Sequence, residues 1–286
     1  MTDTGGPGEG NDYPWAVWRL LKDGPADGAF NMALDEAILL AVAEDRAPPT
    51  LRLYTWQPGC LSVGYAQPLK RDFDLEACRA MGYDVVRRPT GGRAVLHIDE
   101  LTYSVTLPQD DPRVAGGVVS SYQRLSEGLL AGLRRLGVDA TQAQPSRHEP
   151  GEGRTAACFD LLSHFEIMVG GKKLVGSAQV RRRGVVLQHG ALPLGGNITR
   201  IVRLLRLSSE EHQARLAARL AEMSTTLAQA SGRVIPFEEA AQALAAGFAE
   251  ALNLELARGG LTDWECQRAD RLREEKYGAE EYTLQR

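Results

Sequence analysis

The sequence predicts an α+β fold: a mixed, largely antiparallel sheet packed with helices, followed by a helical C-terminal segment. Two observations lead to this prediction. Short strand patterns joined by tight turns fill much of the chain before residue 199, whereas helical patterns follow it to the end. A doubly wound parallel sheet would instead alternate strand and helix throughout. At 286 residues the chain is long enough to bury a sizeable core.

The first half of the chain contains most of the predicted strands. Residues 1–12 are glycine-rich and faintly acidic, which predicts a disordered tail. Alternation of apolar and polar residues and turn-forming glycines and prolines delimit the strands, and helical spacing marks two helices. The predicted strands are 15–21, 51–55, 61–65, 83–88 and 101–107, and the predicted helices are 30–41 and 74–81.

The second half begins with a helix over 122–136, which Gly137 ends in the C′ position. Residues 141–157 are polar and contain proline, so we predict a long loop, a feature that is more often functional than idle. Two glycines predict a hairpin between strands 165–169 and 172–180. A strand over 185–192 follows, and the remaining predicted helices are 199–206, 209–223, 237–252 and 262–277.

Composition and motif content exclude several classes of protein. The 33 lysines and arginines against 37 acids give a net charge of −4, which disfavours nucleic-acid binding. The longest strongly apolar run, Ala37–Ala43, is far shorter than the roughly 20 residues that span a membrane. None of the four cysteines forms a CxxC pair, so we expect free thiols and a cytoplasmic location. Phosphate-loop, GxGxxG, HExxH and zinc-spacing motifs are all absent, and no metal is expected.

Three segments combine residue types suited to a reactive site. The first, RRPTGGRAVLH (87–97), places two adjacent glycines after a strand, where the backbone can approach a ligand closely. Its arginines offer planar donors for carbonyl or phosphate oxygens. A tight turn with solvated arginines explains the same residues equally well.

The second segment, AACFD (156–160), places Cys158 at the end of the polar loop, where a nucleophile would be accessible. A lone cysteine is, however, more often a small buried hydrophobe. The third segment, GGKKLVGSAQ (170–179), follows strand alternation, which puts Lys173 and Lys172 on opposite faces. At most one lysine therefore points into a site, and a hairpin with two solvated lysines is the alternative.

Together and in this order, three stretches resemble a known family: RRPTGGRAVLHIDELTYSV (87–105), ACFD (157–160) and EIMVGGKKLVGSAQVRRRGVVLQHGAL (166–192). The family is that of the lipoate and octanoate protein transferases and ligases related to biotin protein ligase, and the match is best with LipM-type octanoyltransferases. The resemblance runs from about Trp15 to Lys276-Tyr277. It implies a catalytic domain over 13–235, with 236–286 as a helical extension of the same domain.

The resemblance implies an enzyme that takes an octanoyl group from octanoyl-acyl carrier protein onto a cysteine. The group then passes to a lysine of a lipoyl domain or of the glycine cleavage H protein. Cys158 matches the acyl-thioester cysteine, and Lys173 matches the lysine that lowers its pKa, since a nearby cation favours a thiolate. Thioester exchange is nearly isoenergetic and amide formation is downhill, so neither ATP nor a metal is expected. The other cysteines, Cys60, Cys78 and Cys266, are expected to be structural.

The resemblance also implies substrate-binding residues in the first and third stretches. Gly91, Gly92 and Arg93 would line the acyl carbonyl and the pantetheine, and backbone N–H groups near Gly176 would form an oxyanion hole. The octanoyl chain would occupy an apolar slot. The full set of predicted substrate-binding residues is Arg88, Gly91, Gly92, Arg93, His97, Gly176, Ser177, Ala178 and His189. For the two histidines, a purely structural role is the alternative.

Arg181, Arg182 and Arg183 either steer an acidic carrier protein or form a solvated turn. One position departs from the family pattern: an aspartate usually follows the residue matched by His97, whereas here Ile98 intervenes before Asp99. That acid is therefore assigned no role.

Three other functions stay open from the sequence. An ATP-dependent lipoate–protein ligase needs no thiol, so Cys158 argues against it, as does the lack of room for a further C-terminal domain. A non-catalytic module that binds acyl carrier protein would not need both Cys158 and Lys173. An amidotransferase that moves octanoyl groups from H protein to lipoyl domains also uses a cysteine, and the sequence separates it poorly.

Overall fold

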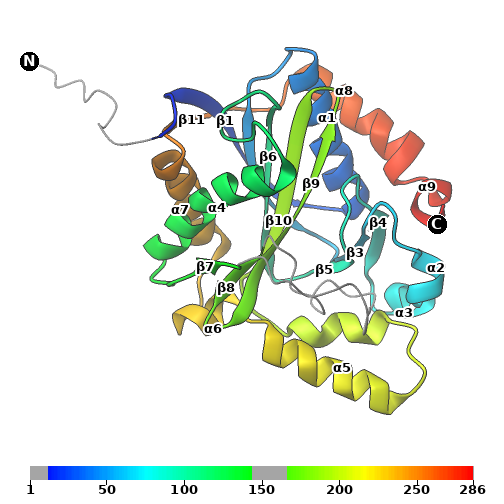
Figure 1. Cartoon of the computed structure of the whole chain (residues 1–286). Coiled ribbons are helices and arrows are strands. Elements are labelled where there is room, and N and C mark those ends of the chain that lie inside the picture. Colours follow the sequence, from blue (N-terminus) through cyan, green and yellow to red (C-terminus); the bar gives the residue numbers. More distant parts are fainter. Residues whose placement is uncertain (1–11, 144–165, 286) are drawn as a thin grey trace, which may run out of the picture.

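The computed structural model of the chain describes residues 12–143 and 166–285 (Figure 1). At its centre lies an eight-stranded sheet. In spatial order its strands are β11 (Leu254–Arg258), β1 (Ala16–Ala26), β2 (Thr50–Trp56), β6 (Glu100–Pro108), β10 (Val185–Pro193), β9 (Lys172–Arg182), β8 (Ile167–Val169) and β7 (Thr141–Gln142). β1 is parallel to β11 and β2, and the other neighbouring pairs are antiparallel. The predicted mixed, largely antiparallel sheet is confirmed.

A second, three-stranded sheet lies beside the first and was not predicted as a separate unit (Figure 1). Its central strand, β3 (Cys60–Val63), is parallel to β4 (Asp84–Arg87) and antiparallel to β5 (Val95–His97). The chain between β4 and β5 carries the two glycines of the first motif. The small sheet therefore presents that glycine turn toward the main sheet.

Helices cover both faces of the main sheet. On one face α4 (Val118–Arg135) and α7 (Phe237–Ala251) pack against each other, and the other face carries α1 (Gly28–Ala43) and α8 (Asp263–Leu272) (Figure 1). A π-helical turn (η2, Arg273–Tyr277) follows α8 and packs against it, and α9 (Glu280–Leu284) packs against η2 and β4. The remaining helical segments are α2 (Leu69–Asp72), α3 (Leu75–Ala80), the 3₁₀ helix η1 (Ile198–Leu204), α5 (Glu210–Met223) and α6 (Leu227–Ser231).

Strand alternation divides the core of the main sheet between its two faces. Leu53 of β2 belongs to the apolar cluster under α4 and α7, whereas the next residue, Tyr54, belongs to the cluster under α1. Because both faces are covered, β6 is buried along almost its whole length. The side chains of the predicted site lie mainly on the Tyr54 face.

Local signals in the sequence account for several element ends. Asp27 caps α1 by accepting a 2.8 Å hydrogen bond from the N–H of Phe30. Gly137 has a φ of 78° just after α4, as predicted for a C′ glycine. Gly170 and Gly171, with φ of 56° and 78°, form the predicted hairpin turn between β8 and β9.

Two secondary-structure predictions are wrong. The chain is not helical throughout after residue 199, because Leu254–Arg258 forms β11 and pairs with the edge of β1. An open strand edge needs hydrogen-bond partners, and Leu254 and Leu256 supply apolar side chains to the core cluster under α7. The predicted loop over 141–157 begins with a strand, since Thr141 and Gln142 pair with β8. The rest of that loop and residues 1–11 lie outside the described residues.

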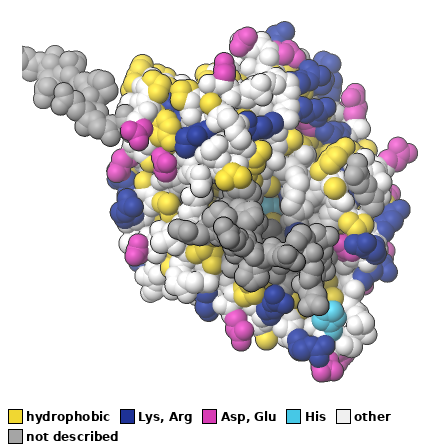
Figure 2. Space-filling view, in the orientation of Figure 1, with side chains coloured by type: hydrophobic (Ala, Val, Ile, Leu, Met, Phe, Trp, Pro, Cys, Tyr) yellow, Lys and Arg dark blue, Asp and Glu magenta, His cyan; other side chains and the backbone are white. Residues whose placement is uncertain are grey.

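The surface mixes both signs of charge (Figure 2). In that view, lysine and arginine side chains gather near the end of the molecule where α1 and α8 lie, among scattered acids. None of the described helices combines the length and apolar character that a membrane crossing requires.

Candidate active site

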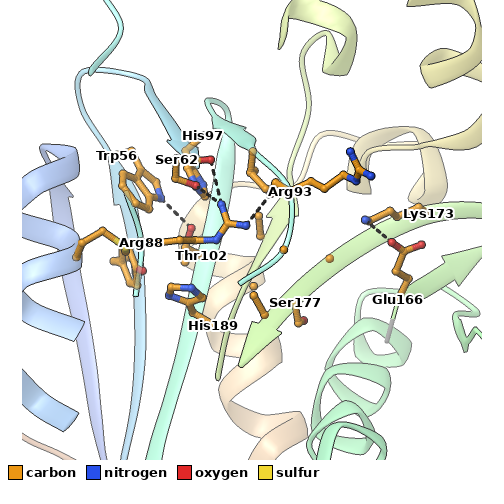
Figure 3. Close-up of a pocket in the computed structure, with 18 residues that line it drawn as sticks. Trp56, Ser62, Arg88, Arg93, His97, Thr102, Glu166, Lys173, Ser177 and His189 are labelled. Carbon is orange, nitrogen blue, oxygen red and sulfur yellow. Dashed lines mark hydrogen bonds and ion pairs between the residues drawn. The ribbon is translucent and has the colours of Figure 1, made fainter. Parts of the chain in front are cut away.

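A cavity of about 260 Å³ lies between the small sheet and strands β9 and β10 of the main sheet (Figure 3). It brings together the first and third sequence motifs, which are some 80 residues apart in the chain. The predicted residues that line it are Arg88, Gly92, Arg93, His97, Lys173, Gly176, Ser177, Ala178 and His189. Gly91 is the one predicted binding residue of the described chain that is not part of the lining.

Lys173 is almost fully buried, at 2% exposure, and its Nζ lies 2.5 Å from Oε1 of Glu166 (Figure 3). Glu166 lies just before β8, is 1% exposed and also lines the cavity. Lys172, by contrast, is exposed at the surface. Of the two adjacent lysines, only Lys173 reaches the site, as the strand alternation predicts.

Gly176 makes room for the Lys173 side chain. A Cβ at position 176 would lie 2.9 Å from Cε and 3.0 Å from Nζ of Lys173, closer than carbon atoms normally approach. The absence of a side chain at position 176 therefore lets the ammonium lie across β9. Beyond Val175 no described strand pairs with the outer edge of β9, so the backbone of Gly176 faces no ladder partner there.

Arg88 holds the glycine turn in place. Its guanidinium donates to the backbone oxygen and hydroxyl of Ser62, both at 3.0 Å, and to the backbone oxygens of Gly91 and Arg93. With 5% exposure it acts as an internal brace of the turn. The same turn packs against Gly64, where a Cβ would lie 2.0 Å from the Gly92 backbone oxygen. Only glycine fits at that contact.

The Arg93 side chain extends from the turn toward the side of the cavity that holds Lys173 (Figure 3). Within residues 12–143 and 166–285, no hydrogen-bond or ion-pair partner accepts from its guanidinium. Of the two cavity arginines, Arg93 is thus the one whose donors are not already bound to the described protein.

His97 has both ring nitrogens bonded. Nδ1 lies 2.8 Å from Oε1 of Glu100, and Nε2 lies 2.7 Å from the Ser62 hydroxyl. Its ring stacks on Trp56, with centroids 4.0 Å apart and planes inclined by 15°. Trp56 itself donates to the Thr102 hydroxyl at 2.8 Å. The imidazole therefore forms part of a packed wall on the side of the cavity opposite Lys173 (Figure 3).

His189 connects the glycine turn to a buried carboxylate. Its Nε2 lies 2.7 Å from the Thr90 hydroxyl and its Nδ1 lies 3.1 Å from Asp35 on α1. Burial lowers the pKa of His189, so the neutral ring accepts from Thr90 and donates to Asp35. The hydrogen bonds from Thr90 through His189 to Asp35 therefore tie the glycine turn to α1.

Asp35 is fully buried and accepts four hydrogen bonds, from Arg52, Tyr54, Ser104 and His189. Burial alone would raise the pKa of Asp35, but the His189 hydrogen bond and the Arg52 charge together hold it below its usual value. The carboxylate is therefore ionised and serves as the fixed centre of this network.

Ser177 lines the cavity, but its hydroxyl is engaged elsewhere. The Ser177 Oγ lies 2.7 Å from the Tyr103 hydroxyl, and Tyr103 belongs to the core cluster under α4 and α7. A Cβ at Gly190, between them, would lie 2.6 Å from both side chains. Among the atoms of Ser177, the backbone is thus better placed than the hydroxyl to meet a ligand.

Cys158, the predicted nucleophile, lies outside the described residues. Cys60, Cys78 and Cys266 are free thiols, and none lines the cavity. Burial raises the pKa of Cys60 well above its usual value and that of Cys78 to about 11, which suits a structural role. Cys266 is exposed on α8 rather than packed in a core.

The remaining sequence features lie outside the cavity. Asp99 pairs with Arg200 at 2.6 Å near the surface. Arg181 donates to backbone oxygens of Val114 and Gly116 ahead of α4, and Arg182 pairs with Glu36 at 2.9 Å. Arg181 and Arg182 are therefore held by the fold rather than being fully solvated.

Sequence reasoning missed several residues that shape the cavity. Glu166 opens the third motif, and Asp35 lies in an apolar helix, where an acid is itself a signal of a buried polar network. Met32, Tyr54 and Trp56 bring apolar surface to the cavity from α1 and β2. These three carried no signal beyond ordinary core spacing.

The model of the lipoyl protein ligase A/B catalytic domain family matches residues 27–249 of the chain. The chain is 46% identical over 273 residues to the octanoyltransferase LipM of Symbiobacterium thermophilum, covering 94% of this chain and 98% of that protein. Identity to the octanoyltransferase LipM of Kyrpidia tusciae is 46% over 275 residues, with 94% and 99% covered. A solved bipartite lipoate protein ligase from Thermoplasma acidophilum is similar, with a TM-score of 0.77, 25% identity, and 94% and 96% covered.

Proposed function

The chain belongs to the lipoyl protein ligase A/B catalytic domain family, and from that premise we propose how it carries out octanoyl transfer in protein lipoylation. The octanoyl group moves from octanoyl-acyl carrier protein to the thiol of Cys158. It then moves to a lysine of a lipoyl domain or of the glycine cleavage H protein. The observation that carries the proposal is that Lys173 is buried in the same cavity as the first-motif turn.

In the first step the Cys158 thiolate attacks the carbonyl carbon of the octanoyl thioester on phosphopantetheine. A new carbon–sulfur bond forms, the bond to the pantetheine sulfur breaks, and the departing thiolate takes up a proton. A cation favours the thiolate form of a nearby thiol, and Lys173 is a cation that the fold holds inside the cavity. Lys173 therefore serves to activate Cys158.

In the second step the amine of the acceptor lysine attacks the acyl-Cys158 carbonyl. An amide bond forms, the thiol of Cys158 leaves, and the amine proton is transferred to it. Backbone N–H groups on the outer edge of β9 near Gly176 would stabilise the oxyanion, because no described strand pairs with that edge. Arg93 would bind polar groups of the pantetheine or the acyl carbonyl.

The octanoyl chain would occupy the part of the cavity lined by Met32, Tyr54 and Trp56. Each methylene removed from water there contributes about 0.8 kcal/mol, which is roughly 5 kcal/mol over the chain. Such a gain is sufficient to set a preference for acyl length. The thioester donor is already activated, so the proposed reaction requires neither ATP nor a metal ion.

The described cysteines are free thiols, which supports a reducing compartment and hence a cytoplasmic location. No nucleic-acid or membrane partner forms part of the proposal.

The overall reaction tests the proposal. Octanoyl-acyl carrier protein and an apo lipoyl domain or apo H protein are mixed with the enzyme without ATP, and octanoylation of the acceptor lysine is followed by mass spectrometry. We expect modification that is lost in Lys173→Gln and kept in Lys172→Gln, because only Lys173 enters the cavity. Modification that needs ATP and free octanoate would instead identify a ligase. Transfer only from octanoyl-H protein would identify the amidotransferase.

A further inference from the structure

We infer that Glu166 is a positioning residue that holds the Lys173 ammonium inside the cavity. This inference rests on the proposed function, in which Lys173 activates Cys158. The pair is close, with 2.5 Å between Lys173 Nζ and Glu166 Oε1, and both side chains are at most 3% exposed. At this burial the contact differs from the solvent-exposed ion pairs of the surface, which contribute little.

Backbone hydrogen bonds hold both Glu166 and Lys173 in place, independently of the contact between their side chains. The Glu166 backbone oxygen accepts from the N–H of Ala143 at 2.8 Å, which extends the pairing of β7 with β8. The Lys173 backbone oxygen accepts from the N–H of Thr225 at 2.9 Å. The Glu166 carboxylate is therefore held in a fixed position, and by binding the Lys173 ammonium it determines where the flexible lysine side chain ends.

The course of the lysine chain shows that this end point matters. Lys173 lies across Gly176, so close that a Cβ at position 176 would be 2.9 Å from Cε and 3.0 Å from Nζ of the lysine. A lysine has four rotatable bonds in its stem and would lose considerable freedom on adopting one such course. The carboxylate of Glu166 compensates for this cost by binding the ammonium where it lines the cavity.

The charge balance of the cavity explains why the carboxylate is needed. Among the described lining residues the positive side chains are Arg88, Arg93 and Lys173, and Glu166 is the sole carboxylate. Arginine keeps its proton in proteins, whereas a lysine in a buried, positively charged setting can release it. Without Glu166, the flexible Lys173 side chain would lie beside two arginines with no carboxylate among the described lining residues, and we expect it to leave the cavity.

Alkylation of the thiols tests this inference without any acyl donor. The protein is treated with iodoacetamide at pH 7 and digested, and the labelling rates of Cys158 and Cys266 are compared by mass spectrometry. Cys266 is exposed on α8 and serves as an internal reference, whereas Cys60 and Cys78 are fully buried. The ratio of the two rates follows the thiolate fraction at Cys158 and cancels differences in reagent and protein concentration.

We expect Glu166→Gln to lower the Cys158-to-Cys266 ratio about tenfold, the equivalent of one pKa unit at the thiol. Lys173→Gln should lower it similarly, and the double variant should lower it no further, because Glu166 acts through Lys173. Glu255→Gln, at an exposed position on β11, should leave the ratio unchanged. An unchanged or higher ratio in Glu166→Gln, or effects that multiply in the double variant, would overturn the inference.

Glu166→Asp provides a second variant in case Glu166→Gln does not fold. It keeps the negative charge but withdraws it by one methylene, so we expect a ratio between those of wild type and Lys173→Gln. A ratio equal to wild type, or as low as that of Lys173→Gln, would count against positioning by Glu166. Failure of the proposed function would appear separately, as a wild-type enzyme that transfers no octanoyl group in the overall reaction.

Discussion

Replacing Gly176 by alanine should separate activity from stability in this enzyme. The added Cβ would lie 2.9 Å from Cε and 3.0 Å from Nζ of Lys173, and among residues 12–143 and 166–285, chain neighbours apart, no other atom lies within 4 Å of it. Carbon atoms in contact normally stay about 3.5–4.0 Å apart. The lysine end must therefore withdraw by roughly 0.6 Å or more, away from its place beside Glu166.

The cost in stability should be small because the atoms in the way belong to the far end of a flexible side chain. An off-rotamer adjustment costs about 0.5–1.5 kcal/mol, and we expect a loss of about 1 kcal/mol in the free energy of unfolding. The cost in rate should be larger. A misplacement of about 1 Å in an active site can reduce the rate about 100-fold, so we expect a 10- to 100-fold slower transfer.

Urea denaturation and single-turnover octanoyl transfer measure the two effects on the same protein. Gly24→Ala is the matched control, since Gly24 also lies in a strand and a Cβ there meets no atom of the described chain within 4 Å other than its neighbours in sequence. A Gly176→Ala variant that transfers octanoyl groups at the wild-type rate would show that the position of the Lys173 end does not limit transfer. A loss of more than about 3 kcal/mol would contradict the expected small cost in stability, because such a cost indicates overpacking of a rigid core.

Three further predictions concern the scaffold around the cavity. Asp35→Asn should lower the free energy of unfolding by about 3–5 kcal/mol in urea denaturation, because it breaks a buried pair and leaves Arg52 without that charge. Burial lowers the pKa of His189, so the imidazole binds a proton more tightly in the unfolded chain than in the folded protein. The melting temperature should therefore fall as the pH drops below about 6.5, and His189→Gln should weaken this pH dependence. Gly64→Ala should reduce kcat/KM at least about tenfold, because its Cβ displaces the Gly92 backbone; wild-type kinetics would contradict the proposed role of that turn.

The strands of the fold could largely be predicted from local patterns. Alternation over Leu101–Leu107 identified the central strand β6, and paired glycines at 170 and 171 identified the hairpin that carries Lys173. The strand β11 was missed because it spans five residues between predicted helices and is stabilised by pairing with β1, at the other end of the chain. Such long-range pairing leaves little trace in the local sequence.

Site residues, like strands, could be predicted where a local pattern marks them and not where distant partners define their role. Strand alternation predicted that at most one of Lys172 and Lys173 points into a site, and in the structure Lys173 is buried whereas Lys172 is exposed. Glu166 and Asp35 could not be assigned, because their roles depend on partners brought close by the fold, such as His189 at 154 positions from Asp35. Arg88 lines the cavity and its donors also brace the glycine turn, so its predicted binding role stays a prediction.

Transfer through a Cys158 thioester is tested most directly by the intact mass of the enzyme after mixing with octanoyl-acyl carrier protein in the absence of ATP. We expect the enzyme to gain one octanoyl group that hydroxylamine removes and that an apo lipoyl domain or H protein discharges. The adduct should be lost in Cys158→Ala. Cys266→Ala should keep the adduct, because Cys266 lies on α8 and outside the cavity lining. A wild-type enzyme that gains no octanoyl group, or an adduct that persists in Cys158→Ala, would show that the octanoyl group does not pass through Cys158.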